Sequence, residues 1–316
     1  MNGHTFHSAE PLSVYEILPM REPRIPLRRV ILHAALFLST FATTFLAGAF
    51  FALSGVAVED LGAALIHPAI VSSGLAYSFT LLTILLAHEL GHYLACRYYG
   101  IQASLPYFIP APPVIGIGTF GAFIRIQEPI RSRRALFDVG IAGPLAGFAV
   151  ALPAAIVGLW FADPAPPIPL TEGAITFNDP PLFILLQRVF DLPVMIQWNP
   201  IHFAAWVGML ATSLNLLPLG QLDGGHIAYA LLGPRGHRWM ARGIFFLMIG
   251  LAFYAYSHHR WAGWFVYVGL IGLLIGLKHP PVGDEHQPLD HRRKVLGIIA
   301  LIVFALSFMP FPITIT

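Results

Sequence analysis

The sequence predicts an all-α polytopic membrane protein with about six to seven transmembrane helices and a small membrane-edge β-hairpin or re-entrant segment. The 316 residues are 56% hydrophobic and 11% charged, and the mean hydropathy is +0.70; soluble domains contain about 25% charged residues. A helix crosses the hydrocarbon core with about 20 apolar residues. Most of the charge-free runs reach this length, and they cover residues 30–58, 61–88, 139–162, 192–222, 243–259, 261–277 and 295–316.

The basic residues predict the orientation of these spans, because Lys and Arg concentrate in cytoplasmic loops. With the N-terminus inside and seven crossings, all 18 basic residues except Arg188 and Arg260 fall on the cytoplasmic side. We therefore expect a multi-pass integral membrane protein in contact with the lipid bilayer. The net charge of +2 reflects this topology and predicts no nucleic-acid partner.

The chain divides into a tail and one membrane domain. Residues 1–29 are polar and rich in proline, which predicts a cytoplasmic N-terminal tail, and residues 30–316 are expected to form a single transmembrane domain. The first apolar run exceeds the apolar core of a signal peptide, about 7–15 residues, so it is expected to remain as an anchor. A compact chain without a transit-like leader favours a prokaryotic plasma membrane. The single cysteine, Cys96, excludes an internal disulfide and a thiolate metal cluster.

The segment between Arg97 and Arg134 lacks helical periodicity. Four prolines between residues 106 and 113 oppose a helix, while the following stretch TFGAFIRI suits a short strand. Apolar, non-helical backbone at a membrane must be paired or line a cavity. We therefore expect a β-hairpin or a re-entrant loop here.

The next span, residues 137–161, carries Gly143 and Gly147 in small-xxx-small spacing. This spacing lets two helices approach closely, and direct substrate contact is the alternative interpretation. The loop that follows, residues 163–200, is expected to be extracytoplasmic and too short for an inserted globular domain.

The stretch LLAHELGHYLACRYYG, residues 85–100, places two histidines and a glutamate in an apolar helix. Residues four apart lie on one helix face, so His88 and His92 can bind one metal ion. Glu89 lies beside them, where its carboxylate can take a proton from a water that the metal activates. An ionisable group near the membrane interior is costly and is by default functional. A helix-end glutamate that reaches the interface is the alternative.

A catalytic zinc ion needs a third protein ligand and an open position. Asp223 is the only charged residue between Asp191 and Arg235, and the topology places it on the same side and at the same depth as the histidines. The site is therefore predicted to face the cytoplasm. His226 is an alternative ligand, although an ordinary hydrogen bond is the simpler interpretation. The other histidines are expected at loops or interfaces: His33, His67, His202, His237, His258, His259, His279, His286 and His291.

These motifs together resemble the site-2 proteases, which are intramembrane zinc metalloproteases. The resemblance rests on HELGH at 88–92, GPLAG at 143–147 and NLLPLGQLDGG at 215–225, and it covers a core from about residue 70 to 235. It implies one zinc ion per chain, bound by His88, His92 and Asp223. Many relatives also carry a PDZ insert or a nucleotide-sensing domain, and we expect neither here.

The resemblance also implies roles for residues around the metal. Glu89 would be the general base, and Asn215 would hold the substrate backbone or the developing oxyanion. Pro218 would break the helix so that Asp223 turns to the metal. The strand-like segment resembles a membrane-edge sheet to which an unwound substrate adds as a strand. The expected substrate-binding residues are Gly118, Thr119, Phe120, Gly121 and Pro218.

The predicted function is hydrolysis of peptide bonds within or near transmembrane segments of single-span or multi-span membrane proteins. The first alternative is a di-iron membrane desaturase or hydroxylase, but His258 and His259 lack the further histidine that would complete a second histidine box. The second alternative is a non-catalytic zinc-binding scaffold or a transporter. A structural zinc site is more often closed by four Cys or His ligands and does not need Glu89.

Overall fold

The computed structural model describes residues 26–53, 67–113, 116–165, 172–193, 195–284 and 288–316. Most of these residues are helical, which confirms the predicted mostly-α class; the N-terminal tail up to residue 25 lies outside the described residues. The helices are α1 (Leu27–Leu53), α3 (Pro68–Tyr98), α4 (Arg133–Trp160), α5 (Pro181–Val189), α6 (Pro200–Asn215), α7 (Asp223–His259), α8 (Gly263–Leu270), a π-helical turn (Ile271–Ile275) and α9 (His291–Ser307).

The long helices account for the predicted membrane character. Within the described ranges, four helices are long and apolar enough to cross a membrane, namely α1, α3, α4 and α7. Helices α6, α8 and α9 occupy the remaining predicted runs but are shorter. The span count of six to seven therefore stays a prediction.

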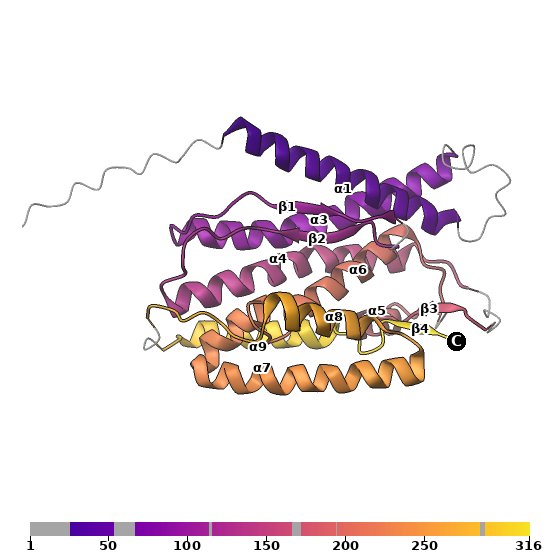
Figure 1. Cartoon of the computed structure of the whole chain (residues 1–316). Helices are drawn as coiled ribbons and strands as arrows, with labels where there is room; N and C mark the ends of the chain where they lie inside the picture. The colour runs from indigo at the N-terminus through magenta and orange to yellow at the C-terminus, as the bar shows by residue number, and fades with distance from the viewer. Residues whose placement is uncertain (1–25, 54–66, 114–115, 166–171, 194, 285–287) are drawn as a thin grey trace, which may run out of the picture.

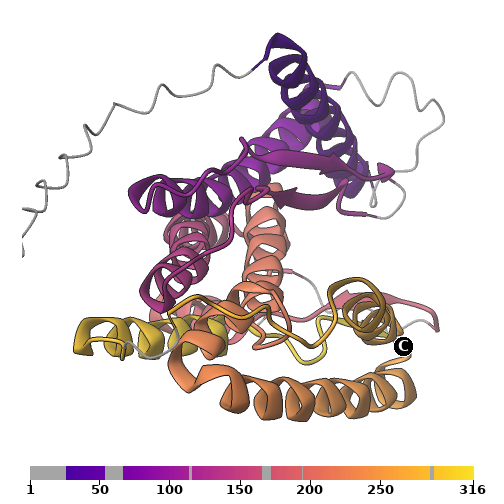
Figure 2. The ribbon, with the colours of Figure 1, turned by 60° about the vertical axis from the view of Figure 1, so that its left-hand side comes forward.

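The predicted hairpin is confirmed. Strands β1 (Tyr107–Pro110) and β2 (Thr119–Phe123) pair antiparallel, with Tyr107 opposite Phe123 and Ile109 opposite Gly121. The hairpin packs along α1, where the Thr43 hydroxyl donates a hydrogen bond of 2.7 Å to the Gly118 carbonyl. Helix α1 therefore supports the hairpin on one side, and Figure 2 shows both strands beside it.

The C-terminal end differs from the prediction of helix up to residue 316. Helix α9 ends at Ser307, and strand β4 (Ile313–Ile315) pairs antiparallel with β3 (Ile175–Phe177). Pro310 and Pro312 lie between them, and proline removes the backbone donor that a helix needs. The segment expected to be only a loop, residues 163–200, accordingly contains β3 and α5.

The helices form a stack that brings the motif-bearing segments together (Figure 1). Helix α3 packs against α1, α4 and α6, and α4 also packs against α7 and α9. Tyr77, Phe183 and Trp206 are fully buried in the apolar core shared by α3, α5 and α6. The three motifs, which begin at residues 88, 143 and 215, therefore lie on packed neighbouring helices.

A polar cluster ties three helix ends together. The Arg293 guanidinium of α9 donates from Nε to Asp138 Oδ1 of α4 at 2.9 Å, and from Nη2 to the Tyr99 hydroxyl at 3.1 Å. Tyr99, which follows α3, also donates to Asp138, and Arg293 pairs with Asp290. Burial of the Tyr99 hydroxyl, and then the Asp138 carboxylate beside it, raise the pKa of Tyr99.

Replacing Arg293 by Met should lower the free energy of unfolding in detergent by about 1–3 kcal/mol, because hydrogen bonds to a charged group are lost and Asp138 keeps no cation. Thermal unfolding of the purified chain measures this change. Arg292→Met is the matched control, because Arg292 is exposed on the same turn. An equal loss of stability in both variants would contradict the role assigned to the cluster.

Candidate metal centre

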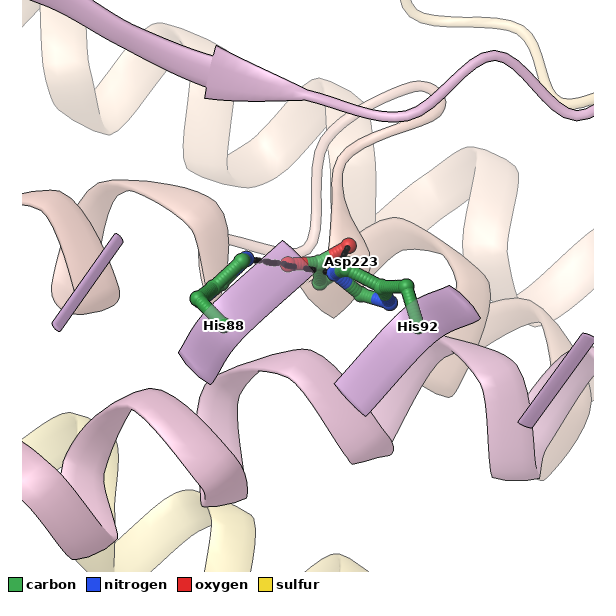
Figure 3. Close-up of side chains that lie close together, drawn as sticks. All are labelled: His88, His92 and Asp223. Carbon is green, nitrogen blue, oxygen red and sulfur yellow. Dashed lines mark hydrogen bonds and ion pairs between the residues drawn. The ribbon is translucent and has the colours of Figure 1, made fainter. Parts of the chain in front are cut away.

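Two buried histidines and a partly buried aspartate converge between α3 and the start of α7 (Figure 3). His88 Nε2 lies 3.2 Å from Asp223 Oδ2, and His92 Nε2 lies 3.3 Å from Asp223 Oδ1. The two Nε2 atoms are 3.1 Å apart. The ligand atoms of these three side chains all lie within 4.8 Å of one another, so the group could hold a metal ion.

The helix boundaries explain how Asp223 reaches the histidines. His88 and His92 occupy adjacent turns on one face of α3, as their spacing predicts. Helix α6 ends at Asn215, the chain runs without helix through Pro218, and α7 begins at Asp223. The predicted break at Pro218 is therefore where the chain turns, and it places the carboxylate at the first residue of a new helix.

A backbone carbonyl fixes the ring of His92. His92 Nδ1 lies 2.7 Å from the Val139 carbonyl oxygen of α4, so this nitrogen carries the proton and donates it. The lone pair is then on Nε2, which faces Asp223 and His88. Such a second hydrogen bond sets the tautomer of a metal-ligating histidine.

Two glycines of α4 give the histidines their space. A Cβ atom on Gly143 would lie 2.1 Å from His92 Nε2, and one on Gly147 would lie 3.1 Å from His88 Cβ. On the facing helix, a Cβ on Gly91 would lie 2.4 Å from the Ala142 carbonyl oxygen. Helices α3 and α4 therefore approach closely at these glycines, as the small-residue spacing predicts. The imidazoles of His88 and His92 occupy the space that larger side chains on α4 would fill.

The residues fit a divalent metal ion. Asp223 Oδ2 is buried and lies 3.2 Å from His88 Nε2 without the geometry of a hydrogen bond, as expected of two atoms that share a cation. Two imidazole nitrogens and one carboxylate oxygen form the ligand set of catalytic zinc sites that keep one position open. The chemistry of the donors agrees with the predicted zinc cofactor.

Glu89 and Asn215 flank the three predicted ligands. Glu89 is 6% exposed and next to His88 on α3, and the backbone of Ile124, just after β2, hydrogen-bonds to its carboxylate. Asn215 Nδ2 lies 3.3 Å from His88 Nε2. The last residue of α6 thus brings an amide to the metal ligands, and the end of the hairpin contacts the predicted base.

The predicted substrate-binding residues lie on two segments. Thr119, Phe120 and Gly121 belong to β2 and Gly118 precedes it, while Pro218 lies in the turn between α6 and α7. The Phe120 side chain is 64% exposed, and the Thr119 hydroxyl donates to the Ile109 carbonyl. The structure places these residues on the hairpin and on the turn that leads to Asp223. Their contact with substrate stays a prediction.

Two histidines differ from their prediction as loop or interface residues. His202 and His237 lie inside α6 and α7 and are 0% and 2% exposed. His202 Nε2 is 3.3 Å from Asp179 Oδ1, and His226 Nδ1 is 2.7 Å from His279 Nε2. These partners, like Val139, are distant in sequence, so no local spacing could have identified them.

Fold and site together define a membrane-type helical protein with an HExxH metal group. Residues 76–256 match the family described as peptidase family M50. The chain belongs to this family, which confirms the resemblance to site-2 proteases. The match spans the three predicted ligands together with Glu89 and Asn215.

Curated relatives carry names of the same class. The chain is 31% identical over 269 residues to the probable zinc metalloprotease EGY2, chloroplastic, of Arabidopsis thaliana, covering 82% of this chain and 46% of the relative. It is 30% identical over 269 residues to Arabidopsis EGY1, also a probable zinc metalloprotease, covering 80% and 46%. It is 23% identical over 303 residues to EGY3 of Oryza sativa subsp. indica, covering 87% and 47%. The chain thus spans about half the length of these relatives.

Replacing Gly143 by Ala should weaken zinc binding about 10–100-fold, because the new methyl group displaces His92 from its position. Zinc content after dialysis against graded free-zinc buffers measures this change. Gly250→Ala is the matched control, since a Cβ there meets no atom within 4 Å. Unchanged zinc affinity in Gly143→Ala would show that the close approach does not position the ligand.

Proposed function

We propose that this chain is a zinc-dependent intramembrane peptidase that hydrolyses peptide bonds within or near transmembrane segments of membrane-protein substrates. The observation that carries the proposal is the convergence of His88, His92 and Asp223 beside the buried carboxylate of Glu89. Membership of peptidase family M50 supports it. Nothing in the comparisons favours a di-iron oxygenase, a scaffold or a transporter.

The proposed chemistry assigns a step to each residue. Zinc, when bound by His88, His92 and Asp223, lowers the pKa of water and polarises the scissile carbonyl. Glu89 takes the proton from the attacking water and returns it to the leaving amine. The Asn215 amide, which lies at the same ligands, donates a hydrogen bond to the oxygen that becomes negative.

The proposed substrate site is the hairpin beside the metal group. A transmembrane helix hides its carbonyl groups in hydrogen bonds, so the scissile segment must unwind before it is attacked. An unwound segment can add to a strand edge by backbone hydrogen bonds. Strand β2, with Gly118 to Gly121, is the proposed acceptor, and its exposed Phe120 would contact the substrate side chains.

The proposed orientation places the N-terminus and the active site towards the cytoplasm. The end of α3 and the starts of α4 and α9 meet in the Arg293 cluster, and Arg133 Nη2 donates to the Leu231 carbonyl of α7 at 3.1 Å. The basic residues of these segments therefore gather at one end, as the positive-inside rule requires of the cytoplasmic face. The proposed single domain is residues 30–316, with its core at 70–235.

The proposed membrane is a prokaryotic plasma membrane, as the sequence predicts. The plant relatives carry the word chloroplastic in their names, so they lend this assignment no support. The membrane character of the helices is the same whichever membrane contains the protein.

Replacing Glu89 by Gln should lower the rate of cleavage of a single-span model protein in liposomes by about 10²–10⁴-fold, because the amide cannot accept the proton. Zinc content should not change, because Glu89 is not a ligand. Mass spectrometry of the products and metal analysis of the same samples measure both quantities. The control is Glu128→Gln, which changes an exposed glutamate between the hairpin and α4.

Cleavage within the span by wild type, and its loss in Glu89→Gln at full zinc content, is the expected result. Cleavage by Glu89→Gln at the wild-type rate would contradict the role of the base. Failure of zinc-loaded wild type to cut any of a broad panel of membrane proteins would contradict the peptidase itself.

Replacing Asn215 by Ala should lower kcat by about 10²–10³-fold with little change in KM, because the donor acts on charge that develops only in the transition state. Kinetics that follow the release of a soluble reporter from the cleaved substrate measure both constants, and the zinc content is determined in parallel. Gln102→Ala, which removes an exposed amide, is the control. A loss of activity that matches a loss of zinc would instead make Asn215 a support for His88.

A further inference from the structure

A second group of histidines lies outside the metal centre. His226 and His237 belong to α7, and His279 lies in the segment that follows the π-helical turn. His226 Nδ1 is 2.7 Å from His279 Nε2. The ring of Tyr229 stacks on His279 with 4.3 Å between the ring centroids, and this contact fixes the plane of His279.

The ring spacing of His226 and His279 matches that of imidazoles that share an ion, and the ring of His237 lies somewhat farther from His279. Two imidazoles bound to one tetrahedral ion, at a metal–nitrogen distance of about 2.0–2.1 Å, have ring centroids about 5 Å apart. The centroids are 4.9 Å apart for His226 and His279, and 5.7 Å apart for His237 and His279. The predicted catalytic ligands His88 and His92 have a similar separation of 4.8 Å.

The tautomer of His279 leaves a lone pair inside the cluster. His279 Nδ1 is 2.7 Å from the Pro280 carbonyl oxygen and therefore donates its proton there, so Nε2 is an acceptor that faces His226. Burial lowers the pKa of His279 and keeps the ring neutral, which is the form that binds metal ions.

His237 adds an unpaired nitrogen. His237 is only 2% exposed, and its Nε2 atom is buried without a hydrogen-bond partner among the described residues. An unpaired buried polar atom costs about 1–3 kcal/mol. A hydrogen bond between His226 and His279 leaves this cost in place, whereas a cation shared by the three rings would remove it.

The histidine cluster lies about one helical turn from the metal centre along α4. A Cβ atom on Gly140 would lie 2.8 Å from His226 Cβ, and one on Gly143 would lie 2.1 Å from His92 Nε2. Residues three apart lie on the same helix face. The same face of α4 therefore packs against both groups, and neither group needs the other's side chains as ligands.

We propose that His226, His237 and His279 form a second site for a divalent transition-metal ion such as zinc or cobalt. Binding requires the nitrogens of His226 and His279 to separate from 2.7 Å to about 3.3 Å, and the His237 ring to move towards them. Three imidazoles leave one position for water or an anion. The site is additional to the proposed catalytic centre, and its existence does not depend on peptidase activity.

The test is the number of cobalt ions bound by the full chain in detergent, with the d–d absorption of tetrahedral cobalt as the spectroscopic readout. Wild type should bind about two ions per chain, and His279→Gln and His237→Gln should each bind about one. His258→Gln is the matched control and should keep both ions, because His258 is exposed and stacks on Tyr254. Thermal unfolding shows which variants are folded.

A second background separates the two sites. The double variant His88→Ala/His92→Ala should keep about one cobalt ion, and adding His279→Gln should remove it. A single wild-type ion that is lost in the His88→Ala/His92→Ala variant, or an extra ion that persists without His279 and His237, would overturn the proposal. If the catalytic centre binds no cobalt, wild type and the double variant bind the same single ion, and His279→Gln removes it. Failure of the proposed catalytic centre is therefore distinguishable from failure of this site.

Discussion

The structure depends on the contact between a partly buried carboxylate and two buried imidazoles inside an apolar helix stack. Asp223 lies 3.2 and 3.3 Å from His88 and His92, and its Oδ2 atom has no hydrogen bond to any described residue. A charge in a medium of low dielectric constant is costly unless a counter-charge or a metal ion compensates it. The interruption between α6 and α7, which brings Asp223 to this place, is therefore best explained by the ion that the three side chains can hold.

The surrounding fold keeps these groups in position from several sides. Helix α4 supplies glycines where the histidines need space and a carbonyl oxygen where His92 needs an acceptor. Helix α6 ends with Asn215 at His88, and the end of the hairpin reaches Glu89. Because these supporting contacts come from α4, from α6 and from the hairpin, the site is held by packing of the helix stack and not by one local motif. Such support from rigid elements is what a preorganised site requires.

Sequence alone could predict the features that depend on local pattern. The apolar runs predicted the helices, the prolines and the TFGAFIRI stretch predicted the hairpin, and the HExxH spacing with isolated Asp223 predicted the ligand set, whose role as ligands remains a prediction. The pairing of β4 with β3, the Val139 carbonyl on His92 and the cluster of His226, His237 and His279 could not be predicted. These contacts join segments that are at least 42 residues apart, and for the two strands more than a hundred. The periodicity of a sequence does not show which distant segments pack together or how a helix is rotated against its neighbour.

The central claim is that His88, His92 and Asp223 bind the metal ion, and the most direct test is X-ray absorption at the zinc edge of the full chain in detergent. To isolate this centre, the sample is the His279→Gln variant loaded with one zinc ion per chain. The account predicts a first shell of nitrogen and oxygen at about 2.0–2.1 Å, with multiple-scattering features of two imidazoles. The same spectrum in the His88→Ala/His92→Ala/His279→Gln variant, or a sulfur shell at about 2.3 Å, would contradict the account.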